Sequence, residues 1–226
     1  MTRTLVLALL AILTACGDGP PQQSAANQAT AKAEANDVAA VRAPEPVPDT
    51  ARVRLVTEAG TIDLELNGRR APITTANFLA YVDRQRLDGT HFYRAARTRG
   101  APERGFIQGG IHRDYRRMLN PIAHEPTSAT GLRHVSGTVS MARTAPGTAM
   151  GDFFIIVGDM PSMNADARGE DDDERAGYAA FGRVVGGMDV VRRILASPTV
   201  PNAGRGAMRG QMITQQVRII SARRLP

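Results

Sequence analysis

The chain is poor in aromatic residues and in cysteine. Its 226 residues include no tryptophan and one cysteine, and aromatic side chains make up only 4% of the total. No dense block of lysine and arginine occurs, and the formal net charge of +6 is modest. Proteins that bind nucleic acids usually gather basic side chains on one face or in one arm. We therefore expect no nucleic-acid partner. The hydrophobic content of 42% is enough for a globular domain with a real core.

The single cysteine follows a segment typical of exported proteins. Arg3 is followed by an apolar run at residues 5–13 that is too short to span a bilayer. The stretch LTAC, which ends at Cys16, resembles the lipobox of bacterial lipoproteins. That resemblance implies a signal peptide at residues 1–15, cleavage before Cys16 and lipid on that cysteine. An ordinary signal peptide with a chance cysteine is the alternative.

Residues 16–50 show no apolar periodicity and consist largely of Ala, Gln, Asn, Asp and Pro. Such a composition cannot bury enough surface to offset its conformational entropy. We predict a flexible, lipid-anchored linker that holds a domain at residues 51–226 on the periplasmic side of the bacterial cell envelope. Gly17, directly after the cysteine, favours the outer over the inner membrane.

Alternating hydrophobicity predicts a mainly β domain. Residues 52–57 and 61–67 flank a glycine turn and predict a hairpin. A helix is predicted from Pro72 toward Gly89, and a second helix over Met188–Ala196. Further short strands are predicted at residues 92–94, 106–108, 138–142, 153–157, 180–184 and 217–225. Because the helices do not alternate with the strands, the order favours an antiparallel barrel with helices over its open ends.

Six segments, in order, resemble the cyclophilins, which are peptidyl-prolyl cis-trans isomerases. The segments are GTIDLEL with the following AP and NF, FYR, IQGG, GTVSMAR, FFI and YAAFGRVVGGMDVV. The resemblance covers the chain from about Val53 to Pro226. It implies a cyclophilin-like closed eight-stranded antiparallel barrel capped by two α-helices. It also implies an enzyme that accelerates isomerisation of X-Pro bonds during the folding of exported proteins.

The same resemblance implies which residues form the site. Arg94 follows Phe92 and Tyr93 as the catalytic arginine of the family does, and it would donate to the prolyl nitrogen of the twisted amide. Arginine suits this task because it stays charged and presents a rigid fork of donors. Gln108 would bind the substrate backbone. Phe106, Phe154 and Met163 would form the proline pocket, and Ala142, Arg143, Thr144 and Tyr178 would line the rest of the groove.

Three features depart from the family pattern. Residues 95–105 form an insertion that carries Arg97, Arg99 and Arg104, which we interpret as loop charges, and Gly105 stands where a pocket phenylalanine is expected. Asp152 replaces a usual glutamine, and it would pair with Arg94 or compete with the substrate. An acidic insertion at residues 168–177 is interpreted as a solvated loop, with cation binding as the alternative.

No cofactor or metal is expected. The spacings of His91, His112, His124 and His134 match no ligand motif. The expected partners are proline-containing peptides, unfolded exported proteins and the membrane through the lipid on Cys16, and we expect a monomer. A second hypothesis is a proline-peptide binding module or chaperone with little turnover.

Overall fold

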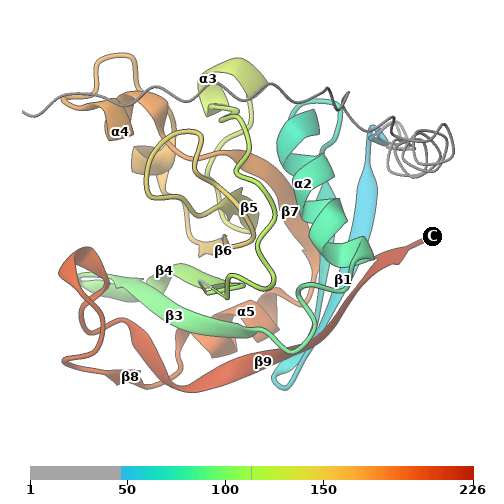
Figure 1. Ribbon diagram of the computed structural model, residues 1–226. Coiled ribbons are helices and arrows are strands. Elements are labelled where there is room, and N and C mark those ends of the chain that lie inside the picture. The colour runs from blue at the N-terminus through green and yellow to red at the C-terminus, as the bar shows by residue number, and fades with distance from the viewer. Residues whose placement is uncertain (1–46, 113) are drawn as a thin grey trace, which may run out of the picture. The chain divides into compact units, whose positions relative to one another are not determined.

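The computed structural model describes residues 47–112 and 114–226 (Figure 1). The predicted signal peptide, Cys16 and the linker up to residue 46 lie outside these residues. No helix in the described part is long and apolar enough to cross a lipid bilayer.

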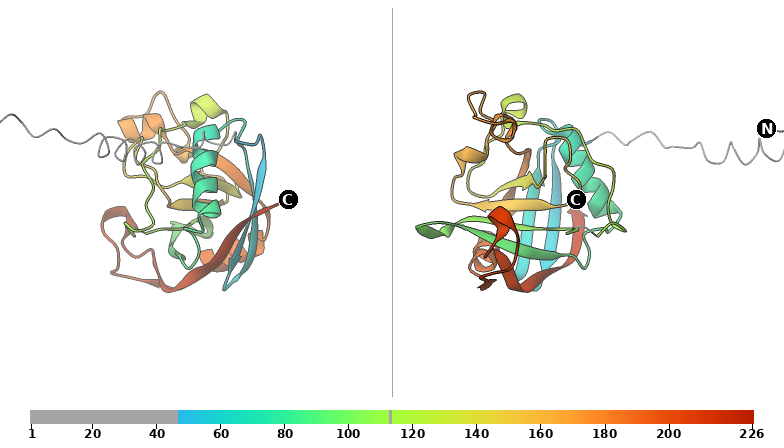
Figure 2. Two further views of the ribbon diagram at one scale, coloured as in Figure 1. Left: turned by 45° about the vertical axis from the view of Figure 1, so that its right-hand side comes forward. Right: turned by 60° about the vertical axis from the view of Figure 1, so that its left-hand side comes forward.

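The described residues form a closed antiparallel barrel. The strands are β1 Ala51–Thr57, β2 Gly60–Leu66, β3 His91–Thr98, β4 Ala101–Gly110, β5 Thr138–Met141, β6 Phe153–Val157, β7 Ala180–Gly186, β8 Thr199–Val200 and β9 Met212–Leu225. Their order is β1-β2-β7-β5-β6-β4-β3-β9-β8, and a further pairing of β1 with β9 closes the sheet. Eight strands therefore form the barrel, and the two-residue β8 pairs with β9 outside it (Figures 1 and 2). The predicted eight-stranded barrel is confirmed.

The opening hairpin has the predicted alternation. Leu55 on β1 lies opposite Ile62 on β2, and Val53 lies opposite Leu64. All four side chains are fully buried, whereas the residues between them are exposed or half-buried. A period of two places one face of each strand in the core. Burial of these aliphatic side chains is what holds the pair in this register.

The two long helices pack against the barrel from different sides. Helix α2, Pro72–Asp83, lies at the upper end of the barrel in Figure 1, and α5, Met188–Leu195, lies at the lower end. Helix α2 contributes Phe78, whose ring lies 5.2 Å from those of Phe153 and Phe181. Helix α5 has an apolar stripe that is buried in the same core, with Val190, Val191, Ile194 and Leu195. Short helices are α3 Thr127–Thr130, α4 Asp172–Ala176, and the 3₁₀ turns η1 Pro161–Met163 and η2 Gly206–Met208.

Helix α2 ends well before Gly89, where we had predicted its end. Gln85 adopts a left-handed φ of 53°, and the N–H groups of Gln85 and Arg86 donate to the carbonyls of Val82 and Tyr81. This is a Schellman motif with glutamine in the place usually taken by glycine. The start of the helix is capped by a residue that is distant in the sequence. The Glu125 carboxylate, from a distant loop, accepts from the N–H groups of Ile73 and Thr74 at 3.1 and 2.7 Å.

The predicted insertion at residues 95–105 is not a separate loop. It continues β3 and β4 into a longer hairpin, with Ala96 opposite Phe106 and Arg97 opposite Gly105. The strand β9 also begins at Met212, earlier than the predicted residue 217, and β8 was not predicted. The acidic insertion contains the short helix α4, capped by the Asp171 side chain at 2.8 Å from the N–H of Glu174.

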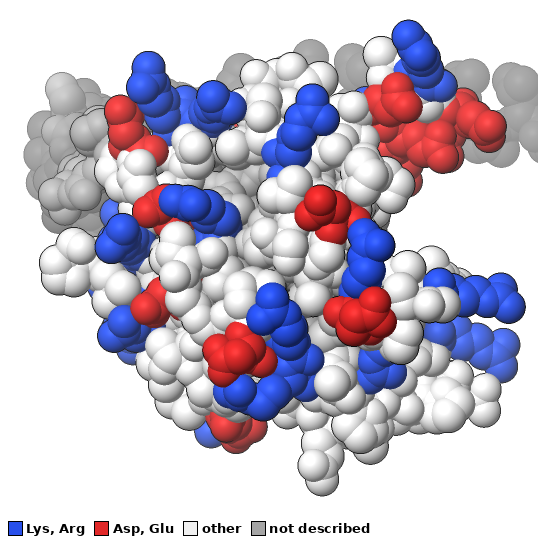
Figure 3. Space-filling view, turned by 180° about the vertical axis from the view of Figure 1, so that it is seen from behind, with Lys and Arg blue, Asp and Glu red and all other residues white. Residues whose placement is uncertain are grey.

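Basic and acidic side chains are interleaved on the face of the molecule seen in Figure 3. Many arginines are paired with carboxylates, for example Arg54 with Asp63 at 2.7 Å and Arg183 with Glu65 at 2.7 Å. The side-chain hydrogen bond from Arg54 is the main cause that lowers the pKa of Asp63. Exposed pairs of this kind stabilise a protein by about 1 kcal/mol or less, so they shape the charge of the surface more than its stability.

Candidate active site

A row of side chains crosses four neighbouring strands on the outside of the barrel. Arg94 on β3 is paired with Gln108 on β4, Gln108 with Phe154 on β6, and Phe154 with Ser140 on β5. Directly paired residues project from the same face of a sheet. Phe106 lies on this face as well, two positions before Gln108. The barrel register therefore brings together three residues predicted for the site from three separate segments, and Phe106 beside them.

Two amide oxygens hold the guanidinium of Arg94. Its Nε donates to Oε1 of Gln211 at 2.8 Å, and its Nη1 donates to Oε1 of Gln108 at 2.9 Å. Its Cζ lies 4.9 Å from the centre of the Phe106 ring. Burial lowers the pKa of Arg94, yet an arginine stays charged at physiological pH. Nη2 donates to none of the described residues, so this edge of the fork is available to a substrate.

Gln108 links Arg94 to a buried tyrosine. Its Nε2 donates to the Tyr93 hydroxyl at 2.6 Å while its Oε1 accepts from Arg94. Gln108 is only 9% exposed. Burial, and next the nearby carboxylate of Asp152, strongly raise the pKa of Tyr93, so its hydroxyl stays protonated. Both ends of the Gln108 amide are therefore occupied within the protein, and its evident task is to orient Arg94.

One of our two expectations was that Asp152 pairs with Arg94, and the structure shows no direct pair between these two described residues. Both hydrogen bonds from the Arg94 guanidinium to described residues end on glutamines. The Asp152 carboxylate accepts from the N–H of His112 at 2.9 Å, and its charge helps to raise the pKa of Tyr93. Asp152 therefore lies near Tyr93, which Gln108 links to Arg94. Its negative charge is separated from the guanidinium by two neutral side chains.

Aromatic rings surround Phe154. The rings of Phe106 and Tyr178 lie 5.2 and 5.4 Å from its ring centre, and His134 is stacked on it at 6.2 Å. Phe154 is only 2% exposed. An apolar wall beside Arg94 is thus present. Phe154 is therefore covered, whereas Phe106 beside it is half-buried and reaches the solvent.

Arg143 has a different environment from the one we predicted. Its side chain is 2% exposed, and its Cζ lies 4.7 Å from the centre of the Tyr178 ring. Its Nη1 donates to the Asp173 carboxylate at 2.7 Å, and Nε and Nη2 donate to the Gly177 carbonyl at 3.1 and 2.7 Å. These bonds fasten the acidic insertion beside Tyr178. Arg143 therefore holds Tyr178 and the acidic insertion in place, and its guanidinium is occupied within the protein.

The other predicted groove residues lie on this same side. The Tyr178 N–H donates to the Met163 carbonyl at 2.9 Å, which places η1 beside the ring. The Ala142 N–H donates to the Asp152 carbonyl at 2.9 Å and so extends the pairing of β5 with β6. Thr144 is exposed, and its hydroxyl lies 3.0 Å from that of Thr148 in the next turn. Thr144 thus belongs to an exposed turn next to the groove.

The extended hairpin is braced by arginines that we had interpreted as loop charges. Arg97 donates to the Leu195 carbonyl at 2.8 Å and also to the Ser197 carbonyl, so it satisfies carbonyls at the end of α5. Arg104 donates to the Asp159 carbonyl at 2.8 Å. Gly105 has a φ of 138°, and a Cβ there would lie 2.0 Å from the Ala96 carbonyl oxygen. Phenylalanine cannot stand at this position, and Phe106 supplies the aromatic wall in its place.

Three residues of the site were not identified from the sequence. Tyr93 is part of the FYR segment but was not assigned a role, and His134 was considered only as a metal ligand. The His134 ring lies 2.9 Å from Asn164 Oδ1 and 3.0 Å from Ser140 Oγ, and burial lowers its pKa. Gln211 is 117 positions from Arg94. No local pattern marks it, because only the pairing of β3 with β9 brings the two side chains together.

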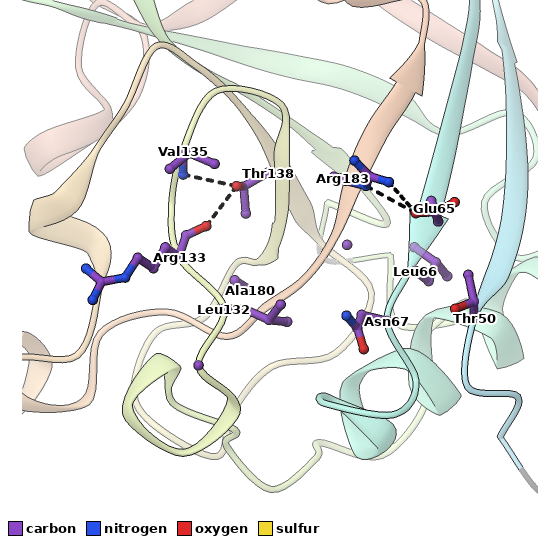
Figure 4. Close-up of a pocket in the computed structure, with 12 residues that line it drawn as sticks. Thr50, Glu65, Leu66, Asn67, Leu132, Arg133, Val135, Thr138, Ala180 and Arg183 are labelled. Atoms are coloured by element: carbon purple, nitrogen blue, oxygen red, sulfur yellow. Dashed lines mark hydrogen bonds and ion pairs between the residues drawn. The ribbon is translucent and has the colours of Figure 1, made fainter.

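No group of three or more metal-ligating side chains occurs in residues 47–112 and 114–226. A cavity of about 360 Å³ lies elsewhere, over β2, β5 and β7 (Figure 4). Leu66, Leu132 and Ala180 are among the residues that line it, with Arg133 and Arg183 among its charged residues. It shares no residue with the row around Arg94. We place the site at Arg94 because donors and aromatic rings converge there.

Comparisons with known proteins agree with this architecture. Residues 52–224 match the model of the family described as cyclophilin type peptidyl-prolyl cis-trans isomerase/CLD. The chain is similar to a peptidyl-prolyl cis-trans isomerase of Acinetobacter baylyi, with 34% identity over 75% of this chain and 82% of that protein. It is also similar to one of Streptomyces antibioticus, with 40% identity over 67% of this chain and 87% of that protein.

A solved structure shows the same fold. The crystal structure of a Cryptosporidium parvum cyclophilin type peptidyl-prolyl cis-trans isomerase, determined in the presence of the dipeptide Ala-Pro, is similar with a TM-score of 0.60. The sequence identity is 20%, and the match covers 77% of this chain and 99% of that chain.

Proposed function

Because the chain belongs to the cyclophilin-type peptidyl-prolyl cis-trans isomerase family, we propose that it isomerises X-Pro bonds in exported proteins, with Arg94 as the catalytic donor. Unfolded exported proteins are the proposed substrates. The observation that carries the proposal is the Arg94 guanidinium, which is held by two neutral amides and keeps Nη2 for a ligand.

The chemistry requires only that the twisted amide becomes more stable relative to the planar one. Amide resonance makes the barrier to rotation about 18–20 kcal/mol. In the twisted state the prolyl nitrogen regains its lone pair and can accept a hydrogen bond. A preorganised cationic donor beside that nitrogen stabilises the twisted state more than either planar isomer. Arg94 supplies this donor, and the rings of Phe106, Phe154 and Tyr178 supply apolar surface for the proline ring.

The test follows cis-to-trans exchange of an X-Pro peptide by NMR with wild type, Arg94→Ala and Arg99→Ala. Arg99 is exposed at the tip of the β3–β4 hairpin and serves as the matched control. Arg94→Ala should lower kcat/KM by roughly 10²–10³-fold, as the loss of one preorganised donor does elsewhere. Arg99→Ala should stay near wild type. The proposal fails if wild type adds nothing to the uncatalysed rate, or if Arg94→Ala retains full activity.

A proline-peptide binding module with little turnover is the second candidate. The departures from the family pattern at residues 95–105 and at Asp152 favour it, because both lie near Arg94 and the row of site residues. The same NMR experiment separates the two. Peptide binding without accelerated exchange would identify the binding module.

We also propose that the domain is tethered to the periplasmic side of the envelope by lipid on Cys16, with the outer membrane as the favoured location. The support is the LTAC stretch after a short apolar run. Mass spectrometry of the mature protein should show a lipid-sized mass increase on Cys16 that the Cys16→Ser variant lacks. A mature protein that keeps an unmodified Cys16 would contradict the anchor.

A further inference from the structure

Gln211 lies at the end of a lobe that connects α5 to β9 and contributes no strand to the closed barrel. The lobe spans residues 197–211 and contains β8 and η2. Its last residue precedes β9, and the Ala95 N–H donates to the Gln211 carbonyl at 2.9 Å. Gln211 is thereby fixed to β3 by its backbone. Its side chain turns to the neighbouring Arg94 and accepts from Nε at 2.8 Å.

The lobe is itself well anchored. The Gln211 N–H donates to the Met208 carbonyl at 3.1 Å, and the Gly210 N–H donates to the Ala203 carbonyl at 2.8 Å. At its other end, Arg97 on β3 donates to the carbonyl of Ser197. The lobe therefore meets β3 at two points, at Ala95 and at Arg97. A side chain held in this way presents its acceptor in one place.

Two contacts on two different nitrogens define the orientation of a planar guanidinium. With Nη1 on Gln108 alone, the group could still rotate about the bonds that precede Nε. The second contact on Nε removes that freedom and directs the Nη2 edge. Both acceptors are neutral amides, so they orient the group and leave its positive charge undiminished. A carboxylate in the place of either amide would neutralise it in part.

We propose that Gln211 is a positioning residue for Arg94, which it holds with the Nη2 edge directed to the substrate groove. The proposal rests on the proposed role of Arg94 in isomerisation. Loss of the Gln211 acceptor should lower kcat more than it changes KM, because the orientation of the donor matters most in the twisted state. We expect a loss on the order of tenfold, below the roughly 10²-fold that a misplacement of ~1 Å can cause.

The test compares Gln211→Met, Gln211→Glu and Gln216→Met. Methionine keeps the length of glutamine without its amide oxygen, and glutamate keeps an acceptor. Gln216 is an exposed glutamine on β9, the strand that follows Gln211, and serves as the matched control. Two readouts are needed: kcat and KM for an X-Pro peptide, and the ¹⁵N NMR signal of the Arg94 Nε–H, assigned by its absence in Arg94→Lys. Thermal unfolding of each variant shows that the fold is retained.

Gln211→Met should lower kcat about tenfold, leave KM within about twofold, and speed solvent exchange of the Arg94 Nε–H. Gln211→Glu should restore slow exchange and recover more of kcat than Gln211→Met, and Gln216→Met should match wild type in both readouts. Unchanged kcat in a folded Gln211→Met variant would overturn the proposal. So would a loss of kcat with an unaltered Nε–H signal. If wild type has no isomerase activity, the proposed function fails, and the NMR signal still shows whether Gln211 holds Arg94.

Discussion

Two arginines at the groove share a setting and differ in their partners. Arg94 and Arg143 each place Cζ close to an aromatic ring, at 4.9 Å over Phe106 and 4.7 Å over Tyr178. Arg94 donates to two neutral amides, and its Nη2 donates to none of the described residues. Arg143 donates to the Gly177 carbonyl and to the Asp173 carboxylate. One guanidinium is oriented for a ligand, and the other fastens two segments together. Residue type and aromatic neighbours do not decide the role of an arginine; the partners of its N–H groups do.

The largest expected effect is a loss of isomerase activity in Arg94→Lys, compared with Arg143→Lys. A lysine at position 94 keeps the charge but cannot contact Gln108 and Gln211 while also directing a donor to the substrate. Arg94→Lys should therefore lower kcat/KM roughly 10²-fold, whereas Arg143→Lys should leave it nearly unchanged. Exchange NMR with an X-Pro peptide measures both. Equal losses in the two variants would show that the two arginines do not have separate roles.

The next effect is on stability and concerns Arg143→Ala. The Gly177 carbonyl, which is buried, would lose a charged donor, while Asp173 is 62% exposed and would be hydrated. We expect the free energy of unfolding to fall by about 2 kcal/mol, mainly from that carbonyl. Urea denaturation measures it. Arg192→Ala, which removes an exposed side chain on α5, is the control and should change little. A loss no larger than that of the control would remove Arg143 from its structural role.

The smallest expected effect is a pH dependence of the free energy of unfolding that comes from Tyr93, the tyrosine linked to Arg94 through Gln108. Burial and the Asp152 carboxylate raise the pKa of Tyr93 in the folded state. A tyrosine in the unfolded chain has a pKa of about 10. The folded state holds this proton more tightly, so the stability it contributes is present below about pH 10 and declines above it. Wild type should be more stable than Tyr93→Phe by about 1 kcal/mol at pH 8. Urea denaturation at pH 8 and at higher pH should show this difference narrowing. A difference that stays constant or widens with pH would contradict the assignment.

Patterns of short range predicted much of the fold. The hairpin of β1 and β2 follows from alternation, and the span of β6 at Phe153–Val157 follows from a short continuous apolar run. The span of α5 at Met188–Leu195 follows from helical periodicity with a glycine before and a proline after. The predicted end of α2 at Gly89 was wrong, because Gln85 adopts a left-handed conformation and ends the helix earlier. Glycine is the residue that usually takes this position, so a glutamine there gives no signal in the sequence. The interpretation of residues 95–105 as a loop was wrong, because these residues extend β3 and β4, and no regular alternation in the segment predicts this.

Prediction of the site from the sequence was uneven for a related reason. Phe154, Gln108 and Arg94 were named from motifs, and the strand register brings them side by side. The hydrogen-bond partners of these side chains could not be predicted in the same way. Asp152 was expected to pair with Arg94 or to compete with the substrate, and its carboxylate accepts instead from the N–H of His112. Gln211 was not considered, since nothing in the residues near it differs from an ordinary polar loop.

Local periodicity and motifs within short segments were enough to predict the mainly β barrel, the family and Arg94 as the candidate donor. The partners of Arg94 and Arg143, and the contact between the extended hairpin and residues 197–211, depend on the folded arrangement of distant segments. The physical reason is that a hydrogen-bond partner is chosen by distance in space. The pairing of β3 with β9 places Gln211 beside Arg94 although 117 positions separate them.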